Sequence, residues 1–334
     1  MHKLFCALIC LCLFTDLAIA APDAARIHRI ERAWGTWVAH NKIKASSIAI
    51  AFNGKIIATT GKNRSATDPA ALASLSKAIT AVCIAKLFEE HSLPLTTSLG
   101  DLTETLRGGG LAYPPQARDI TVAQLITHAS GMNPDITQGT FNRNRNASAP
   151  RDAGYAYAAL KNKARSGAPG KHFYNNGNYA TLGAIIAAVS GQSAETTCKR
   201  LIFTPLGLKS ARLSTEWKAL GAFGGWEMSA EDYLRFGWAA FAPTTPWGAQ
   251  PSDFPNVTLS HGRSYGMGIY QRPTRGGHNF WHFGRICTAG RFTDRGAYFV
   301  RFASGWSFSV NYDFCPEGGI GGELDRALYE AAHN

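Results

Sequence analysis

Strand-forming segments occur at both ends of this chain and enclose a long middle region whose pattern is mostly helical. Residues 47–52 and 55–60 flank Asn53-Gly54, a dipeptide that strongly favours a hairpin turn. Strand patterns return near Tyr265 and alternate through Asp313. A sheet drawn from both ends makes the middle an insertion. We therefore predict an α/β (α+β) fold, in which an antiparallel sheet carries a helical subdomain inserted between its second and third strands.

A helix is predicted at each end of this sheet. The first carries Ile27, Ile30, Trp34 and Trp37 at helical spacing, and the last runs from about residue 322 to 332. We expect both on one face of the sheet. The predicted sheet parts are residues 21–65 and 260–334, and the predicted helical insert is residues 70–245. A chain of this size buries ample core, so we expect the two parts to fold as one unit.

The first 20 residues have the pattern of a signal peptide. Lys3 precedes an apolar run over residues 4–14, and Ala18-Ile19-Ala20 forms a small-residue cleavage site. The apolar run is too short to span a bilayer, and no later segment is long and apolar enough to anchor the chain. We expect cleavage near Ala20, a mature domain over residues 21–334, and a periplasmic or secreted location.

The charge balance is basic, with 34 Lys and Arg against 23 Asp and Glu, a net charge of +11. Such an excess could steer the protein to an anionic cell-envelope surface. The positive residues are scattered singly except around residues 142–151, which we predict to be a surface loop. No basic-plus-aromatic module and no metal-ligand spacing of histidines or cysteines occurs in the sequence. We expect no nucleic-acid partner, no metal and no other cofactor.

Ser74-Leu75-Ser76-Lys77 opens a run with apolar residues at helical spacing. Residues three apart on a helix are neighbours, so a neutral Lys77 amine can take the proton of the Ser74 hydroxyl. An unperturbed lysine titrates at about 10.4, so this chemistry requires burial or nearby cations that lower its pKa. A pattern of two common residue types also arises by chance, and the motif alone leaves a structural role open.

Two more motifs follow in chain order. Tyr174-Asn175-Asn176 lies on a predicted loop just before a small-residue helical run. His282-Phe283-Gly284 ends an aromatic, strand-like stretch at a glycine that would let a substrate approach the backbone. Taken singly, a tyrosine or histidine in such a setting is more often a core residue than a functional one.

A serine–histidine–aspartate triad is not predicted. His128 and Ser130 are two residues apart, so they cannot face each other on a regular element, and the sequence has no Gly-x-Ser-x-Gly elbow.

The ordered trio of motifs resembles the serine hydrolases of the class C β-lactamase and penicillin-binding type, which include D-amino-acid peptidases and β-lactamase-like esterases. The likeness covers nearly all of the predicted mature chain. Further landmarks are similar to those of the family: residues 120–131, residues 202–208, Gly224-Gly225 with residues 229–232, and residues 265–268.

The resemblance implies a role for each motif residue. Ser74 would attack a carbonyl carbon to form an acyl-enzyme, and Lys77 and Tyr174 would share the proton transfer, with the true base left open. Asn176 would donate to a substrate amide or hold Lys77. The backbone N–H groups of Ser74 and Arg285 would form the oxyanion hole. His282, Gly284 and Arg285 would bind the substrate.

Two departures from the family pattern bear on the substrate. His282-Phe283-Gly284 stands where class C β-lactamases usually carry Lys-Thr-Gly, and a neutral imidazole holds a drug's carboxylate less well than that lysine. Arg285 replaces a small residue; its side chain could pair a substrate carboxylate or point into solvent.

We therefore predict an exported serine hydrolase that cleaves a small-molecule or peptide acyl substrate, such as a D-amino-acid peptide, amide or ester, through an acyl-enzyme. One alternative is a true β-lactamase. The other is a penicillin-recognising sensor that is acylated but does not turn over.

Four cysteines follow the predicted signal peptide, and three disulfide pairings are conceivable. Cys83 and Cys198 lie among apolar residues at helical spacing, and we interpret them as small buried hydrophobes that are not reactive. Cys287 and Cys315 each follow a predicted strand. If residues 297–302 and 306–313 form a hairpin, these two cysteines fall at the same end of the sheet. We predict a disulfide between them.

Overall fold

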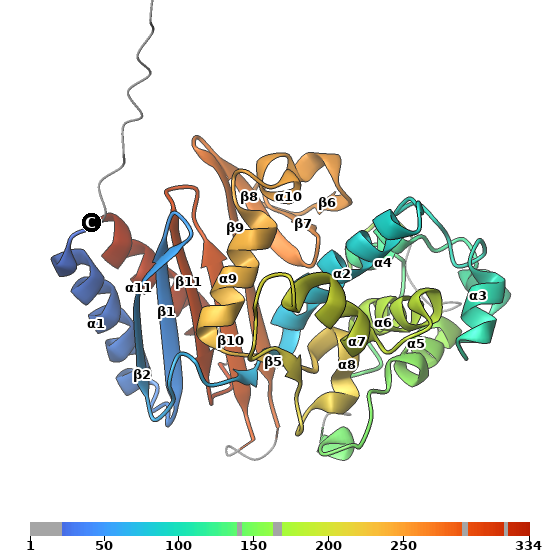
Figure 1. Cartoon of the computed structure of the whole chain (residues 1–334), viewed down its shortest axis with the longest axis horizontal. Helices are drawn as coiled ribbons and strands as arrows, with labels where there is room; N and C mark the ends of the chain where they lie inside the picture. Colours follow the sequence, from blue (N-terminus) through green and yellow to red (C-terminus); the bar gives the residue numbers. More distant parts are fainter. Residues whose placement is uncertain (1–21, 139–141, 163–168, 289–292, 317–319) are drawn as a thin grey trace, which may run out of the picture.

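The computed structural model describes residues 22–138, 142–162, 169–288, 293–316 and 320–334 (Figure 1). The predicted signal peptide, residues 1–20, lies outside the described residues. In the view of Figure 1, a sheet with its covering helices occupies the left and a helical part the right.

Eight strands of the described residues form one antiparallel sheet in the order β2-β1-β11-β10-β9-β8-β7-β6. The predicted hairpin joins β1 to β2 at Asn53-Gly54, both of which have positive φ. The two ends of the chain meet where β1 pairs with β11, with Ile48 opposite Val310. The predicted fold class is therefore confirmed. The strands are β1 (Ser46–Phe52), β2 (Lys55–Lys62), β6 (Asn256–Thr258), β7 (Ser264–Gly266), β8 (Ile269–Thr274), β9 (Gly277–Ile286), β10 (Arg295–Arg301) and β11 (Trp306–Tyr312).

The two faces of the sheet carry different side chains and different helices. Ile48 and Ile50 of β1 face a core shared with α1 (Ala24–His40) and α11 (Ile320–His333). The alternate residues, Ala49 and Ala51, join a second core on the opposite face. There α9 (Ala230–Phe241) packs against β1, β10 and β11. Although α9 belongs to the segment predicted as the helical insert, it covers the second face of the sheet (Figure 1).

The helical part is built around α6, which contacts helices on several sides. Its small residues allow this close packing; an added Cβ at Gly177, for example, would lie 2.4 Å from the Cβ of Ala159. A second, three-stranded sheet has the order β3-β5-β4. The remaining elements are α2 (Ser76–Glu90), α3 (Thr103–Gly108), α4 (Val122–Ile126), α5 (Asp152–Lys161), α6 (Asn176–Ser190), α7 (Ala194–Cys198), α8 (Gly221–Gly224), α10 (Pro246–Ala249), β3 (Ala70–Ala71), β4 (Arg212–Leu213), β5 (Trp226–Met228), the 3-10 turns η1 (Ala73–Leu75), η2 (Pro115–Ala117), η3 (Asn142–Asn144), η6 (Lys218–Leu220) and η7 (Pro251–Asp253), and a π-helical turn at Lys199–Phe203.

Among the described residues, two disulfides join segments that are distant in the sequence. Cys287, at the end of β9, is bonded to Cys315, which follows β11. Cys83 of α2 is bonded to Cys198 of α7, so the interpretation of these two cysteines as merely small buried hydrophobes is incomplete, and this disulfide was not predicted. Both are buried, as their apolar surroundings indicated. Helical spacing predicts burial but does not show which buried side chains of two distant helices face each other.

Within the part of the chain that the structure describes, no helix has both the length and the apolar character needed to cross a bilayer.

Candidate active site

Ser74 lies in η1, immediately before α2. Of residues 70–84, all of which the structure describes, only Ser74 is partly exposed. The turn is fixed on both sides, because Leu72 N–H donates to the Trp226 carbonyl (2.9 Å) and the Tyr233 hydroxyl donates to the Leu75 carbonyl (2.9 Å). Ala73 has a φ of 49°, which is uncommon for a residue with a side chain. The serine hydroxyl is thus the accessible group of an otherwise buried segment.

The amine of Lys77 is placed to take the proton of Ser74. Its Nζ lies 3.0 Å from Ser74 Oγ and donates to the Phe223 carbonyl (2.8 Å). The side chain is fully buried, and desolvation lowers the pKa of Lys77 to about 7, although the nearby negative charge of Asp135 opposes this shift. A large fraction of the amine is therefore neutral at physiological pH.

Hydrogen bonds also fix the segment that contains the Phe223 carbonyl, the acceptor of the Lys77 amine. Phe223 belongs to α8, and the preceding Ala222 donates its N–H to Asp152 Oδ1 (2.9 Å). The Ala222 carbonyl accepts from the Thr80 hydroxyl of α2 (2.7 Å). Burial raises the pKa of Asp152 to about 7. These bonds fix α8 against the same helix that carries Lys77.

Tyr174 lies just before α6 and faces the Ser74–Lys77 pair. Lys77 Nζ is 4.9 Å from the centre of its ring. Desolvation raises the pKa of the Tyr174 phenol well above its ordinary value, and a hydrogen bond with Ser74 opposes that shift. The phenol is therefore protonated at neutral pH and can exchange a proton only together with its neighbours.

Strand β9 brings the third motif to the nucleophile. A Cβ added at Gly284 would lie 2.1 Å from the Leu72 carbonyl oxygen and 3.0 Å from Ser74 N, so only glycine lets β9 approach η1 this closely. His282 is buried, its Nδ1 donates to the Phe283 carbonyl (2.7 Å), and its Nε2 accepts from the Tyr265 hydroxyl (3.3 Å). Burial, reinforced by Lys77, lowers the pKa of His282 to about 3. The imidazole is neutral at physiological pH.

These residues share one pocket of about 350 Å³. Ser74, Tyr174 and His282 line it together with Tyr270, Gly284 and Arg285. Arg285 is exposed, and its Nη1 donates to the Pro316 carbonyl (3.3 Å) at the pocket wall. The structure thus brings together residues more than 200 positions apart around one hydroxyl.

Asn176 is buried at the start of α6, where its side-chain nitrogen donates to the Thr137 hydroxyl (2.9 Å). Its Oδ1 has no hydrogen-bond partner among the described residues. Within the described part of the chain, the Lys77 amine is instead hydrogen-bonded to Ser74 and to the Phe223 carbonyl.

Sequence reasoning missed several groups of the site. Asp135 acts on Lys77 through its charge and accepts the N–H of Asn176 (3.2 Å). Phe223 contributes only its backbone carbonyl, and a backbone group leaves no side-chain motif in the sequence. Tyr270 is stacked on Trp281 and forms a wall of the pocket, a role that follows from strand pairing rather than from a local pattern.

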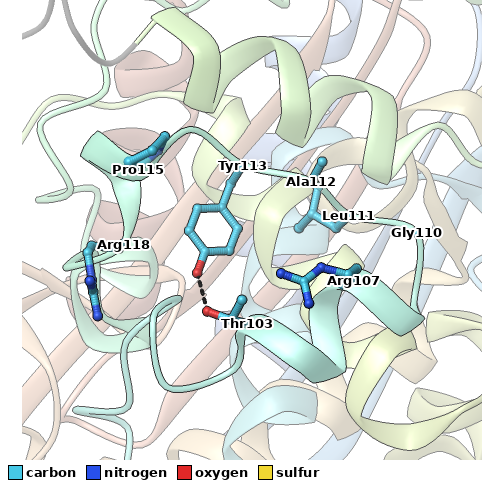
Figure 2. Close-up of a pocket in the computed structure, with 8 residues that line it drawn as sticks. All are labelled: Thr103, Arg107, Gly110, Leu111, Ala112, Tyr113, Pro115 and Arg118. Atoms are coloured by element: carbon cyan, nitrogen blue, oxygen red, sulfur yellow. Dashed lines mark hydrogen bonds between the residues drawn. The ribbon is translucent and has the colours of Figure 1, made fainter.

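A larger concavity of about 640 Å³ lies next to α3 in the helical part (Figure 2). In it Tyr113 Oη and Thr103 Oγ1 are 2.6 Å apart, and the tyrosine also donates to the Leu99 carbonyl (2.8 Å). Arg107 at its edge is paired with Glu104. This concavity shares no lining residue with the Ser74 pocket and presents no pairing of a nucleophile with a base.

Among the residues that the structure describes, no group of three or more His, Cys, Asp or Glu side chains is arranged to hold a metal ion.

Comparison with known proteins places the chain in a family. A family model described as Beta-lactamase matches residues 30–309. Protein flp of Staphylococcus aureus (strain N315) is 29% identical over 194 residues, which are 54% of this chain and 38% of that protein. The chain therefore spans well under half the length of this curated relative.

Solved structures show the same fold. A penicillin-binding protein homologue from Pyrococcus abyssi, described as octameric, has a TM-score of 0.73 at 20% identity, over 92% of this chain and 76% of that chain. A Beta-Lactamase/D-Alanine Carboxypeptidase from Pseudomonas syringae has a TM-score of 0.71 at 18% identity, over 93% of this chain and all of the other (100%). Because the family model covers most of the chain and the fold agrees with it, the protein belongs to the beta-lactamase family.

Proposed function

We propose that the protein is an exported serine hydrolase that cleaves an amide or ester of a D-amino-acid peptide or related acyl substrate through an acyl-enzyme. The observation that carries this proposal is the buried Lys77 amine, with a pKa of about 7, at 3.0 Å from the Ser74 hydroxyl. A serine is a weak nucleophile unless such a neighbouring base takes its proton.

In the proposed reaction, Ser74 Oγ attacks the carbonyl carbon while its proton moves to the Lys77–Tyr174 pair. The N–H groups of Ser74 and Arg285 stabilise the oxyanion, and the close approach of Gly284 to Ser74 N supports this arrangement. The proton then passes to the leaving amine or alcohol as the carbon–heteroatom bond breaks. Water attacks the ester formed with Ser74 and releases the acid.

Arg285 is proposed to bind a carboxylate of the substrate. His282 cannot supply a positive charge, because its pKa of about 3 keeps the imidazole neutral. Arg285 is a cation that lines the same pocket as Ser74. The solved relative from Pseudomonas syringae is described as a Beta-Lactamase/D-Alanine Carboxypeptidase. We therefore favour a peptide or amide with a carboxylate close to the scissile bond, and rank β-lactam hydrolysis second.

Export is supported by the leader pattern of residues 1–20 and by the two disulfides, since disulfides persist mainly in oxidising compartments. The net charge of +11 supports attraction to anionic polymers of the cell envelope.

A chromogenic ester and a D-amino-acid amide test the proposal. Ser74→Ala should abolish hydrolysis, while Ser76→Ala should retain most of it, because the Ser76 hydroxyl is buried and accepts the Trp226 N–H (3.2 Å) instead of reaching the pocket. Steady turnover that depends on Ser74 supports the enzyme. A stoichiometric burst with no turnover would identify a penicillin-recognising sensor, and full activity in Ser74→Ala would reject both.

A further inference from the structure

His128 lies directly behind Tyr174 and is not part of the proposed proton transfer. Its ring is 4.3 Å from the Tyr174 ring, between centroids, and 5.0 Å from those of Tyr179 and Tyr265. The side chain is buried, with 1% of its surface exposed. The His128 ring therefore packs directly against the ring of Tyr174, the proposed catalytic tyrosine.

The backbone of His128 occupies a position that normally takes glycine. It follows the end of α4, and its φ is 57°. Its N–H donates to the Leu125 carbonyl (3.3 Å), and the N–H of Ala129 donates to the Gln124 carbonyl (2.8 Å). This pair of bonds is the Schellman motif, in which the left-handed residue is most often glycine because a Cβ is disfavoured there. A histidine at this position indicates that its side chain is needed.

The His128 side chain and the His128 carbonyl accept hydrogen bonds from the two residues that flank Tyr174. The carbonyl accepts the N–H of Phe173 (2.8 Å), and the ring Nδ1 accepts the N–H of Asn175 (3.3 Å). Asn178 Nδ2 also lies within bonding distance of Nδ1 (3.2 Å). Because the backbone N–H of Asn175 can only donate, Nδ1 must be unprotonated and Nε2 carries the proton.

The imidazole stays neutral in this environment. Burial lowers the pKa of His128 well below its ordinary value, and the nearby Lys77 amine lowers it further when it is charged. The Nε2–H has no hydrogen-bond partner among the described residues and lies among the aromatic rings. Protonation would remove the Nδ1 acceptor, so the surroundings protect the bond to Asn175.

We propose that His128 is a positioning residue of the hydrolase, whose Nδ1 acceptor and backbone carbonyl together hold Tyr174 at the distance from Ser74 and Lys77 that proton transfer requires. This inference rests on the proposed function. It predicts that His128 acts on the reaction only through Tyr174.

Two variants distinguish the effect of the Nδ1 hydrogen-bond acceptor from the effect of the ring's packing. His128→Asn keeps an acceptor at the first branch of the side chain, and asparagine tolerates the left-handed backbone. His128→Phe keeps a ring but loses the acceptor. We expect His128→Phe to lower the acylation rate by about tenfold or more with little change in KM, since small displacements of a catalytic group are costly, and His128→Asn to retain several times more activity. The reverse order would show that ring packing alone matters and would overturn the proposal.

A double-mutant cycle with Tyr174→Phe is the decisive measurement. If His128 acts through Tyr174, adding His128→Phe to Tyr174→Phe should cause almost no further loss. Multiplicative losses would overturn the inference. Thermal melting identifies variants that fold, and His128→Leu replaces His128→Phe in the cycle if the latter does not.

The control is His172→Ala, which removes the half-exposed neighbouring ring (5.8 Å from His128 between centroids) and should leave the rate nearly unchanged. Failure of the proposed function is distinguishable, because Ser74→Ala and Tyr174→Phe would then both remain active. If Ser74→Ala and Tyr174→Phe are inactive but the losses in the double-mutant cycle are multiplicative, the proposed function stands and only the proposed role of His128 is wrong.

Discussion

In the proposed reaction, the protonation state of Lys77 should set the pH dependence of the rate. Its pKa of about 7 means that the amine is protonated and unable to act as a base below this value, and neutral above it. The rate of acyl-enzyme formation should therefore rise as the pH increases through about 7 and then level off. Burst or single-turnover kinetics with an activated ester between pH 5 and 9, roughly the span in which enzyme profiles are resolved, will measure it.

In the proposed mechanism, the pH profile would belong to the coupled Lys77–Tyr174 pair rather than to one side chain. Lys77→Met should remove this dependence together with most of the activity, and it should not lower the melting temperature, because burying an amine is costly. If the rate of the unsubstituted protein instead rises near pH 10, where an ordinary lysine titrates, the assignment of the pH dependence to a Lys77 with a lowered pKa is contradicted.

Arg285 allows a test of substrate charge. Arg285→Ala should raise the KM of a carboxylate-bearing substrate by about tenfold or more, the typical value of a charge-assisted hydrogen bond, and leave a neutral ester unaffected. Arg275→Ala removes the same charge from the exposed turn between β8 and β9 and is the matched control. Equal losses on both substrates would show that the guanidinium does not bind the carboxylate.

The ordered motifs, together with their resemblance to a family, singled out Ser74, Lys77 and Tyr174, which the structure places close together. The motifs did not indicate Asp135 or the Phe223 carbonyl, which reach Lys77 only through the tertiary fold. For the same reason the sequence places His128 only in a family-like segment, excludes it as a triad partner of Ser130 and indicates no other role for it. The role proposed for His128 depends on a left-handed φ and on contacts to a loop about 45 residues away, which no local pattern encodes.

At the scale of elements, the contact between β9 and η1 depends on Gly284. Gly284→Ala would place a methyl group 2.1 Å from the Leu72 carbonyl oxygen, so β9 or η1 must shift. We expect a loss of activity of about a hundredfold or more, since catalytic geometry tolerates little displacement. Steady-state kinetics on folded protein will measure it.

Gly276→Ala is the matched control, because it lies in the same hairpin and its added Cβ would meet nothing closer than 4.0 Å. Unchanged activity in Gly284→Ala would show that the close approach of β9 is not needed.

Helices and strands with a clear pattern in the local sequence were predictable. Elements whose existence or position depends on pairing or packing with distant segments were not. Asn53-Gly54 marked the β1–β2 hairpin, and apolar spacing marked the helix that carries Lys77. Strands β3 and β4 contain only two residues each, too few for an alternating pattern. Helix α9 has a helical pattern, but its position on the sheet depends on small residues such as Ala49 and Gly237 that permit close packing.

At the scale of the whole molecule, the disulfides should contribute unequally to stability. The Cys83–Cys198 bond closes a sequence separation of 115 residues, and the Cys287–Cys315 bond one of 28. Replacing Cys83 and Cys198 together by alanine should lower the free energy of unfolding by about 2–5 kcal/mol, and by more than the same change at the other pair. Urea denaturation will measure both.

Thiol titration gives an independent check. In denatured, unreduced protein that lacks residues 1–20, none of the four remaining cysteines should react with a thiol reagent. Four reactive thiols would contradict both bonds.

The segment that carries Ser74, the proposed nucleophile, contacts both halves of the protein, β5 through Leu72 and β9 through Gly284. Loosening of either half should therefore move Ser74 away from Lys77, its proposed base. Heating should therefore produce no folded but inactive form: the temperature profile of inactivation should superimpose on the loss of far-ultraviolet circular dichroism, and assay signal can serve as a reporter of global melting.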